Sequence, residues 1–292
     1  MSDFYGLPTG VLENEQLRLE YLASAGPRIV RLALHGKPNL LAELPDFHVE
    51  TPNGTFYFRG GHRLWRSPES LTETYLPDNE GQSVEKRADG VRLTWPGGGG
   101  IVKCIDLRLA PDRAAVTLTH ELRNSGAEAV TLAPWALTQL RLGGTALLPQ
   151  PVGKADPEGV RHNRILALWP YTRLDDPRLV LRDDFILIRA TPRPQQVKVG
   201  YYNPHGWLAY WLEGTLFRKT FDVQPGASYP DGGCNAESYC NDQFVELESL
   251  GPLVTLKPGM STCLTEAWEL YSDLEQLFLP PEIRVIVNGA ER

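Results

Sequence analysis

The feature that most constrains the fold of this chain is a period-two alternation of apolar and polar residues, which recurs between turn-forming residues from one end to the other. The segment QLRLEYLA places Leu17, Leu19 and Tyr21 on one face and Arg18 and Glu20 on the opposite face, as in a strand with one buried side. A Gly-Pro break separates this segment from PRIVRLALHG, and we expect the two to form a hairpin. Similar runs continue to CLTEAWELY, and 27 Gly and 24 Pro without a period are suited to the turns between them. The pattern predicts an all-β protein of meandering antiparallel strands.

Evidence for helices is limited to two short segments. They are NLLAEL before Pro45, and SDLEQLFLPP, where Ser272 is suited to cap a helix and Pro280 to end it. Strands do not alternate with long amphipathic helices, which argues against a Rossmann or TIM-barrel architecture. Among 292 residues we find no internal repeat and no mark of a domain boundary, so we expect a single domain over residues 1–292.

The composition restricts the classes of partner and cofactor. The net charge of −7 argues against general binding to nucleic acid or to an anionic membrane, because both require a basic surface. The N-terminal residues show no signal-peptide pattern and no eighteen apolar residues run together, so we expect a cytoplasmic protein, either a monomer or a homodimer. Cys104, Cys234, Cys240 and Cys263 fit no zinc-ligand spacing and are expected to be buried free thiols. We predict no metal and no cofactor, and the GGGG segment lacks the context of a nucleotide-binding loop.

The stretch FRGGHRLWRSPES concentrates polar side chains in thirteen residues. His62 follows a Gly-Gly pair, where the backbone can turn sharply or approach a ligand closely. Arg59, Arg63 and Arg66 flank it, and their planar guanidinium groups suit oxygen-rich ligands. Two readings stay open here, a ligand-binding loop and a loop whose arginines pair with nearby acids such as Glu69.

The segment FVELESLGP carries two glutamates at a spacing of two. In a strand, Val245 and Leu247 would enter the core, while Phe244, Glu246 and Glu248 would share the opposite face. Neighbouring carboxylates in a cleft raise the pKa of one of them, which makes a glutamate usable in proton transfer near neutral pH. The alternative is an exposed strand face with two solvated glutamates.

Five further residues have competing interpretations. His120 is in register with the apolar residues of VTLTHELRN and is best read as a hydrogen-bonded core histidine. Trp65 and Trp135 lie among polar residues and are candidates for stacking on sugar rings, although most aromatic residues are core. His205 follows Asn-Pro and is more typical of a surface loop than of a site. Lys219 in LFRKTF is either a solvated strand end or the cationic partner of an anionic group.

Several motifs together resemble the galactose mutarotase-like superfamily, which includes aldose 1-epimerases and hexose-phosphate epimerases. GGHRLWRSPE, FVELESLGPLVTLKPG and TEAWELY are most similar to an uncharacterised bacterial branch, and the resemblance spans roughly residues 10 to 275. It implies a large twisted antiparallel β-supersandwich with a sugar-binding concave sheet. The ligand expected from it is a small-molecule carbohydrate.

The resemblance also implies roles for individual residues. The region around Gly60 to Pro68 looks like the element that brings a Gly-rich turn and an arginine to the sugar hydroxyls in these epimerases. The LES segment is similar to the LET segment whose glutamate is the general base, which points to Glu248. The candidate ligand contacts from the first element are Arg59, His62, Arg63 and Arg66.

The sequence departs from the epimerase pattern at WALTQL. Trp135 stands where the epimerases have the histidine that protonates the ring oxygen, and Gln139 stands where they have an asparagine. An indole N–H does not release its proton near neutral pH, so another residue must be the acid, for which His62 and Lys219 are candidates, or the chain does not mutarotate sugars.

Two functions follow as competing hypotheses. The first is an epimerase-like enzyme acting at the anomeric carbon of a sugar or sugar acid, with Glu248 as base, Glu246 raising its pKa, and His62 as acid. The second is a carbohydrate-binding protein that has lost the reaction, with Trp65 and Trp135 among its contacts. A glycoside hydrolase or lyase using the two glutamates is disfavoured, because neighbouring residues on one strand face do not flank a sugar from opposite sides.

Overall fold

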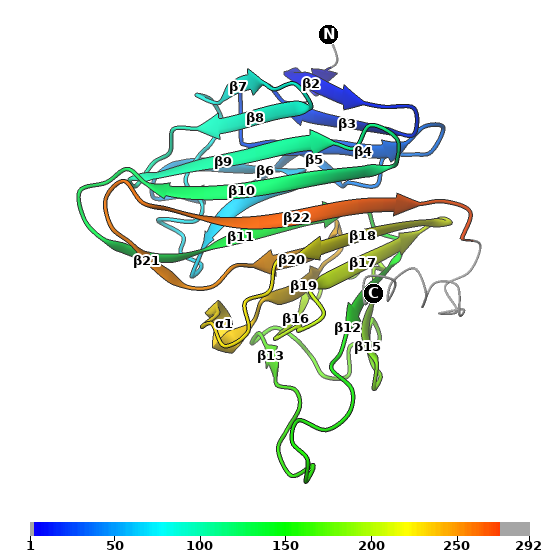
Figure 1. Ribbon diagram of the computed structural model, residues 1–292. Helices are drawn as coiled ribbons and strands as arrows, with labels where there is room; N and C mark the ends of the chain where they lie inside the picture. Colours follow the sequence, from blue (N-terminus) through cyan, green and yellow to red (C-terminus); the bar gives the residue numbers. More distant parts are fainter. Residues whose placement is uncertain (1–2, 275–292) are drawn as a thin grey trace.

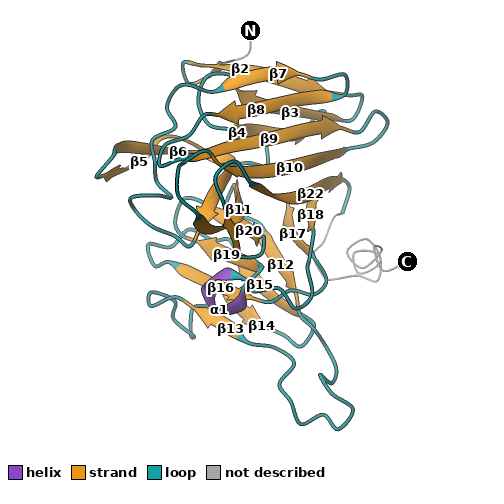
Figure 2. Cartoon of the chain, turned by 60° about the vertical axis from the view of Figure 1, so that its left-hand side comes forward, coloured by secondary structure: helices purple, strands orange, loops and turns teal. Residues whose placement is uncertain are grey.

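The computed structural model describes residues 3–274 and consists almost entirely of β-strands arranged in two antiparallel sheets. In Figure 1, β9, β10 and β22 cross the front of the molecule, and β5 and β6 lie behind them. In Figure 2 the chain is strand and loop apart from one helical turn. Sheet one runs in the order β1 (Asp3–Phe4), β2 (Leu7–Glu13), β3 (Leu17–Leu22), β4 (Arg28–Leu34), β6 (Gly54–Ser67), β11 (Val130–Leu140), β20 (Val245–Leu250), β19 (Ala236–Cys240), β16 (Val197–Tyr201) and β13 (Leu166–Leu168), with β5 (Glu43–Thr51) on β6 and β21 (Val254–Leu256) on β11.

Sheet two covers one face of sheet one. Its order is β14 (Leu179–Leu181), β15 (Phe185–Arg189), β12 (Thr145–Pro149), β17 (Trp207–Leu212), β18 (Thr215–Phe221), β22 (Ser261–Tyr271), β10 (Ala115–Asn124), β9 (Ile101–Leu109), β8 (Gly90–Trp95) and β7 (Ser83–Lys86). The core lies between the sheets, where side chains such as Leu19 and Ile29 of sheet one join Leu118 and Trp268 of sheet two. The prediction of an all-β antiparallel sandwich is confirmed.

The strand alternation read from the sequence is confirmed in detail. β3 and β4 pair as the expected hairpin, with Leu17 and Leu19 fully buried in the core. His120 is also buried in the core, and its Nδ1 lies 3.0 Å from the carbonyl oxygen of Leu264. In β20, Val245 and Leu247 enter the core, so Glu246 and Glu248 point to the outer face of sheet one.

The prediction of a helix at NLLAEL is wrong. Residues 39–44 are extended, because their backbone groups bond to neighbouring strands: the N–H of Leu40 donates to Leu32, and that of Ala42 donates to Gln139. These tertiary bonds override the local helical preference. The helix in the described residues is the single turn α1 (Pro230–Gly233), and the SDLEQLFLPP segment lies mostly outside the described residues. None of the helical structure in residues 3–274 is long and apolar enough to cross a bilayer.

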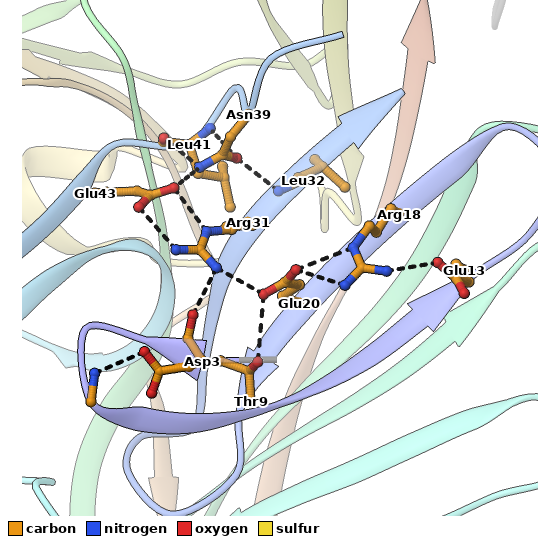
Figure 3. Close-up of polar contacts among 11 residues, drawn as sticks. Asp3, Thr9, Glu13, Arg18, Glu20, Arg31, Leu32, Asn39, Leu41 and Glu43 are labelled. Atoms are coloured by element: carbon orange, nitrogen blue, oxygen red, sulfur yellow. Dashed lines mark hydrogen bonds and ion pairs between the residues drawn. The ribbon is translucent and has the colours of Figure 1, made fainter. Parts of the chain in front are cut away.

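The cysteines are free, and three of the four are buried as expected. Cys263 is the exception, because it lies on the outer face of β22 beside Glu121 and is exposed. A network of ion pairs links the outer side chains of β2, β3 and β4 in sheet one (Figure 3). Arg31 of β4 forms ion pairs with Glu20 of β3 at 3.0 Å and with Glu43 at the start of β5 at 2.9 Å.

Candidate functional site

A pocket of about 350 Å³ lies on the outer face of sheet one, over β6, β11, β20, β19 and β16. Nine aromatic side chains of the described part of the chain line it, together with Arg63, Lys198, Glu69 and Glu246. A larger hollow of about 620 Å³ lies between β2 and β7–β9, but its wall includes a single aromatic residue, Tyr21. Small-molecule sites combine apolar walls with a few convergent polar groups, so the aromatic pocket is the candidate site. Its tryptophans and tyrosines are Trp65, Tyr75, Trp135, Trp169, Tyr171 and Tyr239.

Strand register brings the polar floor of this pocket together. Residues opposite each other in an antiparallel pair share a face, so Arg63 of β6, Leu137 of β11 and Glu248 of β20 form one row across the sheet. The row continues to Glu237 of β19, which is paired with Glu248. These residues are separated by up to 185 positions in the chain, and only strand pairing places them side by side.

Arg63 and Glu246 form a buried ion pair on the pocket floor. Nη2 of Arg63 donates to Oε1 of Glu246 at 2.9 Å, and Nη1 donates to Oε1 of Gln139 at 2.9 Å. The guanidinium also lies 4.5 Å from the ring centre of Trp65. Burial, followed by repulsion from Glu248, raises the pKa of Glu246 to about 7. The sequence hypothesis had Glu246 raising the pKa of Glu248, whereas here the repulsion between the two carboxylates raises the pKa of Glu246.

Glu248 is fully buried directly behind the pocket wall. Its Oε2 accepts hydrogen bonds from Nε1 of Trp135 at 2.9 Å and from Nζ of Lys198 at 3.0 Å. Lys198 also lies 2.7 Å from Oε2 of Glu237 and is packed between the rings of Trp135 and Trp169. Burial opposes the charge on Lys198, but the two glutamates raise its pKa well above the usual range. Burial also raises the pKa of Glu237.

His62 and Lys219 lie on the opposite side of sheet one, so their assignment as candidate acids in the site is wrong. Successive residues of a strand point to opposite faces, and because Arg63 faces the pocket, His62 enters the core. There His62 contacts Nε2 of His120 at 2.7 Å, and Lys219 forms an ion pair with Glu266 at 2.8 Å. Burial lowers the pKa of both His62 and Lys219, with neighbouring cations adding to the effect at His62.

His62, His120 and Glu266 have ligand atoms within 4.8 Å of one another, a spacing that suits a metal ion. Protein groups already satisfy these atoms. The carbonyl of Leu264 only accepts, so Nδ1 of His120 donates to it, and Nε2 of His120 accepts from Nε2–H of His62. Glu266 accepts from Lys219 and from Nε1 of Trp268. The cluster therefore needs no metal to balance its charge or its hydrogen bonds.

The remaining sequence candidates divide between the pocket and its surroundings. Arg63, Trp65, Trp135 and Glu246 line the pocket, while Gln139 lies beneath it as the partner of Arg63. Three candidates do not line it, because other groups hold them elsewhere. The guanidinium of Arg59 bonds to Asn79, that of Arg66 pairs with Glu73 at 3.1 Å, and the Nε2 of His205 lies 3.3 Å from the carbonyl oxygen of Gln150.

Sequence reasoning missed Lys198, which forms an ion pair with Glu248, and Glu237, which pairs with the same lysine. A signal was present for Lys198, because it interrupts the apolar run VKVGY, but not for Glu237, which lies in the mixed segment NAESYC. A charged residue at one position of an otherwise apolar strand indicates a buried ion pair on the second face of the sheet. The aromatic residues Trp169 and Tyr171, which come from the loop after β13, had no such signal.

Comparison with known proteins identifies the fold. No protein family profile and no curated protein matches the sequence. Among solved structures, a proposed aldose 1-epimerase from Escherichia coli K12 superposes with a TM-score of 0.59 at 14% identity, covering 91% of this chain and 100% of the other. A galactose mutarotase-like protein from Lactobacillus casei gives 0.59 at 12%, covering 90% and 100%, and one from Clostridium acetobutylicum gives 0.53 at 9%, covering 93% and 97%. The expected resemblance is confirmed at the level of the fold: this chain is a β-sandwich of the galactose mutarotase-like type.

Proposed function

We propose that this protein binds an uncharged carbohydrate in the aromatic pocket of sheet one. The observation that carries the proposal is the combination of aromatic walls with the Arg63–Glu246 pair on the floor. Aromatic planes stack on the apolar faces of sugar rings, and charged hydrogen-bonding groups bind hydroxyls strongly. Structural neighbours named as an aldose 1-epimerase and as galactose mutarotase-like proteins support the same class of ligand.

The charges around the pocket favour an uncharged sugar over a sugar acid or a sugar phosphate. Both cations that line it are already paired, Arg63 with Glu246 and Lys198 with Glu237 and Glu248. Glu69 adds a further carboxylate at the exposed rim. An anionic ligand would have to compete with these acids for the same cations, whereas a hydroxyl can donate to the carboxylates.

Binding without epimerisation is the primary proposal. A general base must come within hydrogen-bonding reach of the proton that it removes, and Glu248 is separated from the pocket by Trp135 and Lys198. The acid expected at the ring oxygen is replaced by Trp135, and His62 faces the core. The geometry therefore supports the hypothesis of a carbohydrate-binding protein that has lost the reaction.

One observation favours a second candidate function, acid/base catalysis by Glu246. This side chain lines the pocket, and its pKa near 7 allows it both to accept and to donate a proton at neutral pH. In this alternative Glu246, rather than Glu248, exchanges a proton with the bound sugar.

Calorimetry with neutral hexoses, uronic acids and hexose phosphates tests the binding proposal. Replacing the pocket-rim residue Tyr171 by alanine should weaken binding about tenfold, the equivalent of ~1.4 kcal/mol for a lost aromatic contact. Tyr202 is a matched control, because it is 37% exposed against 38% for Tyr171 and does not line the pocket. Saturable binding that is equal in the Tyr171→Ala and Tyr202→Ala variants would place the ligand elsewhere, and preferential binding of phosphates would contradict the charge argument.

Anomeric exchange followed by NMR separates the two candidate functions. We expect no acceleration of exchange by the wild-type protein for any sugar that it binds. Acceleration that disappears in Glu246→Gln, with binding retained, would establish the catalytic alternative instead.

A further inference from the structure

The two sheets end side by side at one end of the molecule. Sheet one ends at β13 and sheet two at β14, and each of these strands pairs with a single neighbour among the described strands. The segments beside them are in contact, because Nη1 of Arg164 donates to the carbonyl of Asp183 at 3.1 Å. Figure 2 shows β13 and β14 together at the lower end of the chain. We call this region, residues 150–184, the β13–β14 end.

The apolar core reaches the surface at the β13–β14 end. Leu168 of β13 lies opposite Val199, and Leu181 of β14 lies opposite Ile186, and both of these partners belong to the core. Residues opposite each other share a face, so Leu168 and Leu181 point into the layer between the sheets. They are nevertheless 41% and 55% exposed. No further strand among the described residues closes the core here.

The loops that flank β13 add further exposed aliphatic side chains. Residues 150–165 project beyond both sheets (Figure 1). Their own polar groups hold this loop, because Oδ1 of Asp156 accepts from the N–H of Val160 at 3.0 Å and Nδ2 of Asn163 donates to the carbonyl of Gly153 at 2.7 Å. Seven of the eleven large hydrophobic residues that are exposed in the described structure lie in the β13–β14 end, which concentrates them in one region. Apart from Tyr171 at the pocket rim, they are Val152, Val160, Ile165, Leu168, Leu174 and Leu181.

The opposite end of the two sheets is built differently. β1 has two residues, and the apolar residue of β7, Val84, packs against the core. The other residues of β7 are polar, and Glu85 forms an ion pair with Arg87 at 3.0 Å. Short or charged edge strands resist pairing with another chain, whereas exposed apolar edges favour it. Of the two ends, the β13–β14 end therefore has the properties of an interaction surface.

The charges at this end favour a second copy of the chain as the partner. Residues 150–184 carry six basic and six acidic side chains, so their net charge is zero. The rest of the chain carries 23 basic and 30 acidic side chains, and these account for the whole net charge of −7. Two copies repel each other through the surfaces that carry this excess, but they meet without net repulsion at the neutral end. Antiparallel pairing of a strand edge with its own copy is also compatible with a two-fold axis.

We propose that two copies of this protein associate about a two-fold axis through the β13–β14 end. At roughly 150–190 Å² for a fully exposed aliphatic residue, the six aliphatic residues of this end expose about 600 Å². Each partner of a standard interface buries roughly 800 Å², of which a little more than half is apolar. The β13–β14 end therefore offers the apolar area that a stable dimer needs.

Sedimentation equilibrium of the full chain tests the proposal. We expect the wild type to form dimers in the micromolar range, and the Leu174→Asp/Leu181→Asp variant to raise the dissociation constant about tenfold or more. These residues are 75% and 55% exposed, so the variant should keep the wild-type circular dichroism spectrum. Met260→Asp is the matched control, because Met260 is 53% exposed and directly precedes β22, outside this end. A wild type that stays monomeric throughout this range would overturn the proposal, as would equal dissociation constants for the double variant and the control.

Cross-linking of a mixture of unlabelled and ¹⁵N-labelled wild-type chains locates the interface without any variant. A carbodiimide joins amines to carboxylates in direct contact, and the β13–β14 end offers Lys154 together with acidic residues such as Glu158. We expect cross-linked peptides that combine one unlabelled and one labelled partner, both from residues 150–184. Mixed pairs found only outside residues 150–184, or pairs at this end that always carry a single label, would contradict the proposed interface.

Discussion

Replacing Lys198 by methionine tests the charge arrangement behind the candidate site. Lys198 lies 2.7 Å from Glu237 and 3.0 Å from Glu248, and these two carboxylates are directly opposite each other on neighbouring strands. Methionine retains apolar contact with Trp135 and Trp169 but removes the only cation between the two acids in the described structure. Removing one partner of a buried ion pair costs about 3–5 kcal/mol, and we expect a loss of this size in the free energy of unfolding at neutral pH.

The pH dependence of this loss follows from the carboxyl groups. Burial already raises the pKa of Glu237, so the folded protein binds that proton more tightly than the unfolded chain does. The stabilisation from such a proton is present at low pH and is lost as the pH rises through the folded pKa. Lys198 holds the pKa of Glu237 down, so without it that pKa should rise further, and the deficit of the Lys198→Met variant should shrink as the pH falls from 7.5 to 5.

Urea unfolding at pH 7.5 and pH 5, followed by tryptophan fluorescence, measures both effects. Lys257→Met is the control, because Lys257 is exposed and its replacement should change stability little. Adding Glu237→Gln to Lys198→Met should recover part of the loss, because only one buried carboxylate then lacks its cation. A Lys198→Met variant that is as stable as the control, or that has the same deficit at both pH values, would refute the conclusion that Lys198 stabilises the fold by neutralising buried carboxylates.

Three further predictions concern stability. The raised pKa of Glu246 stabilises the folded protein at low pH, and this stabilisation, on the order of 2–3 kcal/mol, is lost as the pH rises from 4.5 to 7. Glu246→Gln should therefore flatten the decline of stability over this range, and urea unfolding at several pH values measures the slope. His62→Gln should reduce the loss of stability on acidification below about pH 6.5, because burial depresses the pKa of His62 and the unfolded chain binds the proton more readily. Gly61→Ala should greatly destabilise the fold in thermal unfolding, because a Cβ at this position would lie 1.9 Å from the carbonyl oxygen of Ile29.

Each of these predictions has a contradicting outcome. An unchanged pH slope in Glu246→Gln would show that this group does not titrate between pH 4.5 and 7 in the folded protein. An acid sensitivity of His62→Gln equal to that of the wild type would exclude His62 as its source. Gly36 also has a positive φ but has open space around it, so Gly36→Ala should cost only about 1–2 kcal/mol, and equal costs at Gly36 and Gly61 would exclude the steric clash.

The period-two pattern determined the fold class and much of the strand-level detail. It predicted antiparallel strands, the hairpin of β3 and β4, the buried position of His120 and the shared face of Glu246 and Glu248. These properties are local, because the alternation of side chains along a strand follows from backbone geometry alone. The arrangement of these strands in a sandwich was instead implied by the resemblance of three motifs to the galactose mutarotase-like superfamily.

Tertiary structure alone decided which face of each strand meets the second sheet and which strands are neighbours. His62 and Arg63 are adjacent in the sequence, yet one enters the core and the other enters the pocket. Lys198 and Glu248 are 50 residues apart, yet they form an ion pair. Alternation specifies that neighbours in the chain point in opposite directions, but the packing of the two sheets selects the buried direction, and long-range pairing selects the partners. The candidate site consists of contacts between distant strands, which a local pattern cannot encode.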